Sequence, residues 1–164
     1  MKKYFKILIY SLIYITLVLF FAIMFIVTTR ADIIKPNIEI EPYQVVKIQL
    51  RSLKNNNKPF ENAGIEQTWM FAHPNNKKIT GPLERFKVLL NSDSYKVLLN
   101  HIDHNIIEIK TTDTSAAYDV TVLGREKNYY KFRWIVEKYD FDGPLKDCWL
   151  TIGVSPPVSL GSSI

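Results

Sequence analysis

The feature that most constrains this chain is a run of 21 residues, 7–27, that contains no charged residue, glycine or proline. At about 1.5 Å per residue, a helix over this run would be about 31 Å long. That length matches the hydrocarbon core of a bilayer, about 30 Å. We therefore predict a transmembrane anchor within residues 1–30. A cleaved signal peptide is the alternative, but the apolar part of such peptides usually has only about 7–15 residues.

The charges beside this run predict its orientation. Lys2, Lys3 and Lys6 precede it, whereas Arg30 and Lys35 follow it. Positively charged residues favour the cytoplasmic side of a span, so we expect a cytoplasmic or stromal amino terminus. The rest of the chain would then lie in a thylakoid lumen or a periplasm. Aromatic residues of the run suit contacts with pigments or lipids: Tyr10, Tyr14, Phe20, Phe21 and Phe25.

The net charge of +5 says little about partners, because it is unevenly distributed. Four of the 21 basic residues lie at or before position 30, and all 16 acidic residues lie after it. Residues 31–164 therefore carry a net charge of only +1. Proteins that bind nucleic acid usually present a strongly basic surface. We therefore expect no nucleic-acid partner.

The chain offers little for a disulfide, a metal or a cofactor. Its single cysteine, Cys148, excludes an intrachain disulfide and a multi-cysteine metal site, and we expect it to be a small buried side chain. His101 and His104 have the spacing of ligands on one helix face, but no second pair of ligands accompanies them. We predict no metal and no cofactor.

Proline, glycine and asparagine residues, which interrupt helices and strands, divide the rest of the chain into segments. We expect a tether over residues 31–41, one domain over 42–157 and a flexible tail over 158–164. In the first half of the domain, apolar residues recur at helical spacing. The predicted helical segments are 42–54, 63–72 and 82–90, with a further turn in 95–102 and a loop at 75–80.

From His104 the apolar period changes from helical to two, which is typical of strands with one buried face. Four consecutive strands are expected near residues 107–110, 118–122, 130–136 and 149–154. Helices followed by a meander of strands indicate an α+β fold. We predict about three helices on one face of a curved four-stranded antiparallel sheet, which forms a cone.

Several runs of this sequence resemble an uncharacterised family, the domain of unknown function 4864. They are residues 45–50, 64–69, 71–76, 80–86 and 148–151. The resemblance implies an NTF2-like, cystatin-like cone, in agreement with the element order, and members in bacteria, cyanobacteria and photosynthetic eukaryotes. It implies no reaction and no catalytic residue.

Composition points to an AT-rich genome. Isoleucine, lysine and asparagine together number 47 residues, whereas alanine and glycine number 12. Plastid genomes and reduced bacterial genomes share this bias. With the predicted anchor, it favours a plastid-encoded thylakoid membrane protein of an alga. A bacterial plasma-membrane protein with a periplasmic domain is the alternative.

Aromatic residues and one arginine are the candidate ligand-binding set. Trp69, Tyr118 and Trp134 fall on apolar faces that would meet inside the cone, where core and pocket wall are the same surface. Arg85, in the first turn of a predicted helix, would bind an anion at the mouth of the cone. The alternatives are that the aromatic residues only fill the core and that Arg85 pairs with a carboxylate of the domain.

No catalytic constellation is evident. His73 or Asp119 is a possible general base, but nothing in the spacing singles out either, and no phosphate loop, nucleophile elbow or zinc motif occurs. We predict a single-pass membrane protein with a non-catalytic accessory or assembly role, bound to other subunits of a larger photosynthetic membrane complex. A membrane-tethered small-molecule-binding domain is the alternative, and an enzyme is the third possibility.

Overall fold

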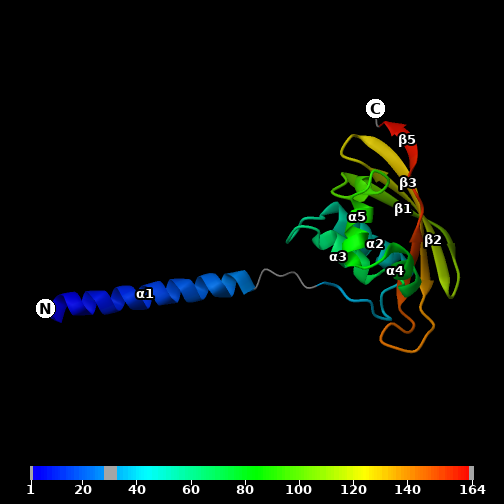
Figure 1. The fold of residues 1–164 in the computed structure, drawn as a ribbon. Coiled ribbons are helices and arrows are strands. Elements are labelled where there is room, and N and C mark those ends of the chain that lie inside the picture. The colour runs from blue at the N-terminus through cyan, green and yellow to red at the C-terminus, as the bar shows by residue number, and fades with distance from the viewer. Residues whose placement is uncertain (1, 28–32, 163–164) are drawn as a thin grey trace. The chain divides into compact units, whose positions relative to one another are not determined.

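The computed structural model describes residues 2–27 and 33–162 (Figure 1). The chain divides into two compact units, Met1–Asp32 and Ile33–Ile164. Helix α1, Lys2–Val27, belongs to the first unit. All other helices and strands of the described chain belong to the second unit, which carries the candidate site.

The predicted transmembrane anchor is wrong. Among the residues that the structure describes, no helix combines the length and the apolar character needed to cross a membrane. A span through a bilayer needs about 20 consecutive, predominantly apolar residues.

The second unit is an α+β structure with helices before strands, as the sequence predicts (Figure 1). Its sheet is antiparallel in the order β1-β2-β3-β4, and the fifth strand, β5, also pairs with β3. The helices are α2 (Pro42–Lys54), α3 (Ala63–Met70), α4 (Pro74–Thr80), α5 (Leu83–Leu90) and the 3-10 helix η1 (Lys96–Leu98). The strands are β1 (Asp103–Thr111), β2 (Ser115–Leu123), β3 (Asn128–Lys138), β4 (Trp149–Val154) and β5 (Val158–Ser162).

Two elements correct the predicted arrangement of three helices on four strands. The expected loop at 75–80 is instead helix α4, which begins with Pro74. The His73 ring caps the start of this helix, because it accepts a hydrogen bond from the Asn75 N–H. Proline suits this position because the first amide of a helix has no partner within the helix. Residues 158–162, expected in the flexible tail, form β5 and complete a five-stranded sheet.

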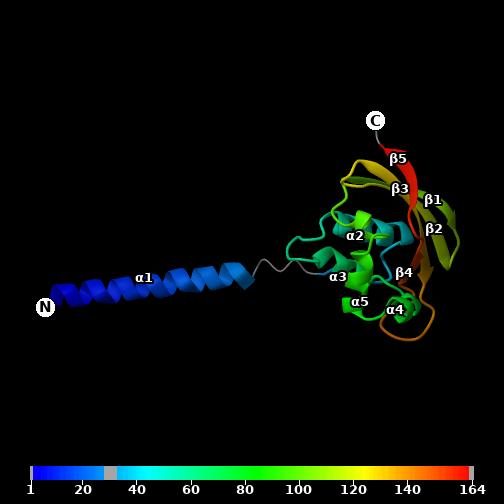
Figure 2. The ribbon, with the colours of Figure 1, turned by 45° about the horizontal axis from the view of Figure 1, so that its top comes forward.

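The helices pack on one face of the sheet (Figure 2). Strand β2 alternates strictly, with its even-numbered residues buried and its odd-numbered residues partly exposed, so only one face meets the helices. The core between the layers contains aliphatic and aromatic side chains from α2, α3, α5, η1, β2, β3 and β4. Its largest fully buried members are Trp134, Tyr118, Phe71, Phe132, Leu50, Leu53, Ile65, Leu98 and Leu150.

A buried glycine sets the distance between α2 and α3. A Cβ added to Gly64 would clash with the backbone oxygen of Ser52. The Gly64 N–H donates to the Asn56 carbonyl at 2.9 Å, and the Ile65 N–H donates to Asn56 Oδ1 at 3.0 Å. The start of α3 is thereby fastened to the chain that follows α2, at a separation that no side chain allows.

We expect Gly64→Ala to destabilise the protein by about 2–3 kcal/mol or more, because the added methyl group meets backbone rather than a movable side chain. Alanine normally stabilises a helix by about 1 kcal/mol relative to glycine, so the sign itself is diagnostic. Gly153→Ala in β4 is the matched control, since nothing lies within 4 Å of its added Cβ. Urea unfolding of both variants measures the difference. Equal free energies of unfolding would contradict the close contact.

Candidate functional site

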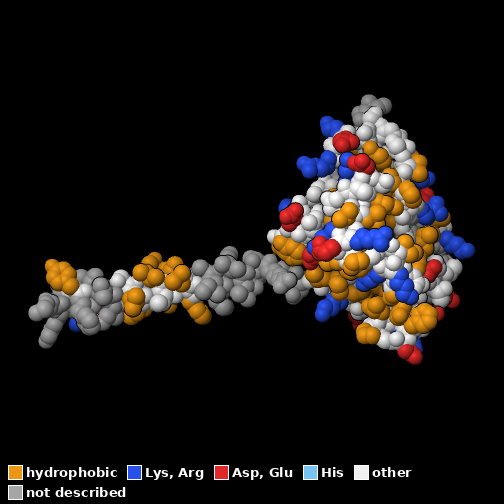
Figure 3. Space-filling view, in the orientation of Figure 1, with side chains coloured by type: hydrophobic (Ala, Val, Ile, Leu, Met, Phe, Trp, Pro, Cys, Tyr) orange, Lys and Arg blue, Asp and Glu red, His pale blue; other side chains and the backbone are white. Residues whose placement is uncertain are grey.

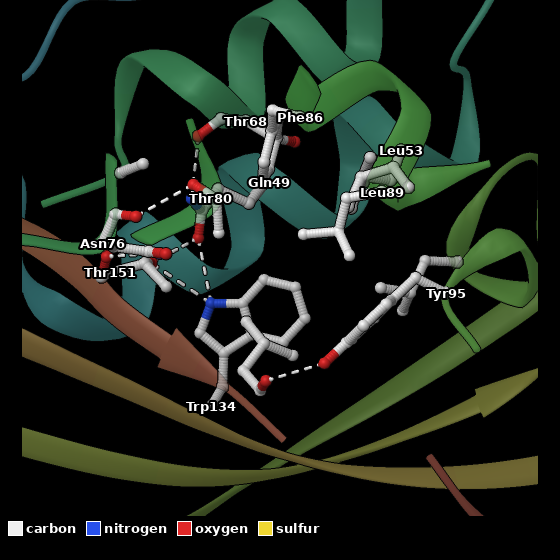
Figure 4. Close-up of a pocket in the computed structure, with 14 residues that line it drawn as sticks. Gln49, Leu53, Thr68, Asn76, Thr80, Phe86, Leu89, Tyr95, Trp134 and Thr151 are labelled. Atoms are coloured by element: carbon white, nitrogen blue, oxygen red, sulfur yellow. Dashed lines mark hydrogen bonds between the residues drawn. The ribbon is translucent and has the colours of Figure 1, made fainter. Parts of the chain in front are cut away.

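A cavity of about 80 Å³ lies between the helices and the sheet (Figure 4). Its apolar wall consists of Leu53, Ala72, Phe86, Leu89, Leu90, Tyr95, Leu98 and Val154. Its polar wall consists of Gln49, Thr68, Asn76, Thr80, Trp134 and Thr151. A mainly apolar cavity with a few polar groups gathered on one side is the usual composition of a small-molecule site.

The polar wall is organised around the side-chain amide of Gln49. Gln49 Oε1 accepts hydrogen bonds from Trp134 Nε1 at 3.0 Å and from Thr151 Oγ1 at 2.6 Å. Gln49 Nε2 donates to the Thr68 carbonyl at 3.0 Å. Gln49 is only 1% exposed, and a buried amide without partners would cost several kcal/mol. These bonds join α2, α3, β3 and β4 at one point.

Two side-chain amides in this wall keep unused hydrogen-bonding capacity. An amide nitrogen carries two hydrogens, and the Gln49 nitrogen uses one of them, toward Thr68. Asn76 Nδ2 donates to the Thr151 carbonyl at 3.2 Å. Within the described part of the chain, Asn76 Oδ1 has no hydrogen-bond partner. Both amides belong to residues that line the cavity.

The mouth of the cavity is formed by residues that are partly exposed. Asn76 and Thr80 lie one turn apart on α4, so they share a face of that helix. Leu89, Tyr95 and Val154 complete the mouth, and the Tyr95 hydroxyl donates to the Val154 carbonyl at 3.3 Å. Burial raises the pKa of Tyr95, so this hydroxyl stays protonated and keeps donating.

The structure separates the four residues that the sequence nominated for ligand binding. Trp134 lines the cavity. Trp69 does not line the cavity, but its ring packs on Phe86, which does, with the two ring centroids 5.0 Å apart. Arg85 is exposed in the first turn of α5. Tyr118 is fully buried against Tyr43, and its hydroxyl has no hydrogen-bond partner among the described residues.

Sequence reasoning missed the most buried polar residues of the site. Gln49 lies three residues after Val46 and one before Leu50, on the apolar stripe of α2. A lone amide on such a stripe is the signal that would have found it, because a buried polar side chain needs a partner. Thr151 lies among the buried residues of β4, so it too is a polar side chain at an apolar position, although a threonine there is a weaker signal than a glutamine.

His101 and His104 form a pair of neutral rings. His101 Nδ1 lies 2.7 Å from the Leu98 carbonyl oxygen and must donate to it. His101 Nε2 therefore accepts from His104 Nδ1, also at 2.7 Å. Burial lowers the pKa of His101 to about 4 and also lowers the pKa of His104. No cluster of potential metal ligands occurs among the described residues.

The other reactive groups lie outside the cavity. Asp119 is on the outer face of the sheet, where it pairs with Arg133 at 2.6 Å and with Lys131 at 3.8 Å. His73 is buried beside Tyr139, and burial lowers its pKa. Cys148 is buried, and burial raises the pKa of its thiol. None of these three residues lines the cavity.

Comparison with known proteins adds no relative. No family model, no curated protein and no solved structure matches the chain. The resemblance to the domain of unknown function 4864 therefore stays a prediction.

We expect the buried His101 to make the protein less stable in mild acid. An unfolded histidine binds a proton below about pH 6.5, whereas folded His101 does so only near pH 4. The unfolded state therefore binds more protons between these values, and stability falls as the pH falls. Between pH 7 and pH 5, His101 should account for a loss of about 2 kcal/mol.

Urea unfolding of the wild type and of His101→Gln at both pH values measures this loss. Glutamine can still donate to the Leu98 carbonyl but does not titrate, so its stability should vary less with pH. Lys54, Asp103 and His104 are the charged or titratable groups that act on His101, and the variant keeps all three. An identical pH dependence in the two proteins would show that His101 is not the group responsible.

Proposed function

We propose that the second unit binds a small molecule whose short apolar end enters the cavity. The observation that supports this most directly is the Gln49 amide, which is buried in the cavity wall and, among the described residues, donates only one of its two N–H groups. Asn76 Oδ1, in the same wall, also has no partner within that part of the chain. Core amides are normally satisfied by the protein itself. Here the unused groups belong to a wall whose remaining members are largely apolar.

The volume limits the ligand. An apolar cavity of about 150 Å³ holds one benzene ring, so a cavity of about 80 Å³ has room for about three or four carbon atoms. A drug-sized site is typically about 300–1,000 Å³. The ligand is therefore either very small or a larger molecule that inserts only one end through the mouth at Asn76 and Thr80.

The wall favours binding over acid–base catalysis. Its polar members are amides, hydroxyls and an indole, which do not titrate near neutral pH. Among the described residues that line the cavity, Tyr95 is the only ionisable one, and burial raises its pKa further from neutrality. Hydrogen bonds from such groups orient a ligand without exchanging protons with it.

Titration with butyramide tests this proposal, because its three-carbon tail matches the cavity and its amide can pair with Gln49 and Asn76. In ¹⁵N-correlated NMR spectra of the full chain, we expect saturable shifts of the Trp134 indole and the Gln49 side-chain amide. A ligand of six non-hydrogen atoms should bind with a Kd of about 1–10 mM.

Filling the cavity should abolish this binding. Ala72→Leu adds three carbons to the wall, and Thr80→Leu adds bulk at the half-exposed mouth, where it is less able to disturb the core. Ala117→Leu is the matched control, because Ala117 lies on the opposite face of the sheet beside Ile135. We expect at least about tenfold weaker binding for the first two variants and no change for the control. Absence of shifts in the wild type would refute the proposal.

An accessory role in a larger complex, predicted from the sequence, is a second candidate, and strand β5 favours it. All five residues of β5 are exposed, with Val158 56% and Leu160 53% accessible. Within the described chain β5 pairs only with β3, so its other edge is open. An open, apolar edge strand is a template for a strand of a partner subunit.

The double variant Val158→Lys/Leu160→Lys tests this second candidate on blue-native gels of native extracts. We expect it to be lost from any high-mass complex, because lysine on an edge strand opposes strand addition. Ile79→Lys/Val88→Lys is the matched control, since both residues are equally apolar and highly exposed, but on α4 and α5. Unchanged migration of the β5 variant, or a wild type that migrates alone, would argue against the accessory role.

A further inference from the structure

A second pocket, of about 340 Å³, lies where the chain around η1 meets the turn between β2 and β3. Residues from 91–100 and from 124–126 line it, together with Tyr130 of β3 and Pro157 between β4 and β5. No described residue lines both this pocket and the cavity around Gln49. Ligand sites usually have volumes of about 300–1,000 Å³, so this pocket is large enough to hold a ligand of its own.

Backbone contacts hold the two sides of this pocket together. The Ile102 N–H donates to the Leu123 carbonyl at 2.9 Å, and the Gly124 N–H closes the turn by donating to the Asn128 carbonyl, also at 2.9 Å. Gly124 allows the two sides to approach closely, because a Cβ added there would lie 2.7 Å from Val97 Cγ2. The pocket is therefore shaped by the packing of the domain.

The apolar part of the lining includes one aromatic ring. Val97, Leu99 and Tyr130 pack against the hydrophobic core and also line the pocket. Each of the three is partly exposed, and Pro157 adds a fourth apolar group. A partly exposed aromatic ring beside aliphatic side chains offers a surface on which the C–H groups of a ligand can pack.

The uncharged polar part of the lining consists of amides and hydroxyls, namely Asn91, Ser94, Asn100 and Tyr130. Each of these side chains can both donate and accept hydrogen bonds. Among the described residues, the side chains of Ser94, Asn100 and Tyr130 have no hydrogen-bond partner in the protein. These groups are therefore available to a ligand that carries donors and acceptors of its own.

The charged residues of the lining balance one another. Lys96 pairs with Asp93 at 2.6 Å, and Arg125 is followed directly by Glu126. On the face of the molecule seen in Figure 3, acidic and basic side chains are likewise interspersed. A lining with two charges of each sign has no net charge with which to attract an ion, so it favours a neutral ligand.

We propose that this pocket binds a neutral sugar of about two rings. A sugar ring combines C–H groups, which pack on apolar and aromatic side chains, with hydroxyls that donate and accept as amides do. A cavity of about 150 Å³ holds one six-membered ring, so about 340 Å³ has room for two. The proposal goes beyond the small-molecule function of the Gln49 cavity and does not depend on it.

Titration of the full chain with maltose, cellobiose, lactose and sucrose tests the proposal in ¹⁵N-correlated NMR spectra. We expect at least one of these disaccharides to give saturable shifts of the Gly124 and Asn100 backbone amides, with a Kd of about 1 mM. The Trp134 indole, in the other cavity, should not shift. Added salt should not weaken the binding, because the ligand carries no charge.

Two variants test the assigned residues. Tyr130→Leu removes the ring but keeps an apolar side chain, and Asn100→Asp removes both amide donors from a residue with a φ of +53°. We expect each to weaken binding about three- to tenfold. Tyr129→Leu and Asn62→Asp are the matched controls. Neither residue lines the pocket, and Asn62 also has a positive φ, of +63°.

Each outcome bears on the proposal. No saturable shift with any of the four disaccharides would overturn it and leave the butyramide experiment unaffected. Shifts confined to the Trp134 indole would place the sugar in the other cavity and would also overturn it. Equal weakening by the variants and their controls would show that Tyr130 and Asn100 do not bind the sugar.

Discussion

The carboxamide of Gln49 is the interaction on which the rest of this domain depends. It is buried under the helices, and it accepts from Trp134 and Thr151 while it donates to Thr68. Buried polar groups are tolerated only when they are paired, so the amide requires α2, α3, β3 and β4 to stand in one relative position. Apolar packing alone allows many similar arrangements, whereas directional hydrogen bonds specify one.

This requirement also explains why a cavity persists. The side chains around Gln49 are directed toward its amide, so they cannot collapse into the neighbouring space as an aliphatic cluster would. On the other side, Gly64 holds α3 against the chain after α2 by backbone contact. The positions of the elements around the opening between α4, α5 and β4 are thus fixed on one side by the Gln49 hydrogen bonds and on the other by the Gly64 backbone contact.

Much of the domain follows from sequence periodicity. The apolar stripe of α2 and the alternation of β2 and β3 are strong signals, because each reflects burial of one face along many residues. Helix α4 was not predicted, because residues 74–80 contain two asparagines and two lysines and bury no side chain. Its first turn depends on Pro74 and on the His73 ring, which are local signals that a search for apolar spacing ignores.

The site was harder to predict than the fold. Trp134 was nominated because large aromatic residues gather in cores, and it does line the cavity. The same reasoning nominated Tyr118, which is a core residue on the same sheet face, away from the cavity wall. Sequence periodicity predicts on which face of a helix or strand a side chain lies. A cavity depends instead on where the packed faces of helices and sheet leave a gap between them. The predicted membrane span was wrong as well: the apolar run 7–27 suggests a span, but among the described residues no helix has the length and apolar character needed to cross a membrane.

Strand β3 is bonded along both edges, which gives the sheet an uneven resistance to local opening. One edge pairs with β2 from Tyr129 to Glu137, and the other is shared by β5 and β4. Between those two strands, the Arg133 backbone bonds to Ser155 through its N–H at 2.8 Å and its carbonyl at 2.9 Å. Amide hydrogens of β3 should therefore be among the last to exchange with solvent, and those of the edge strands β1 and β5 among the first. Because β3 also carries the Trp134 indole, we expect the polar wall of the cavity to stay in place during fluctuations that open its mouth.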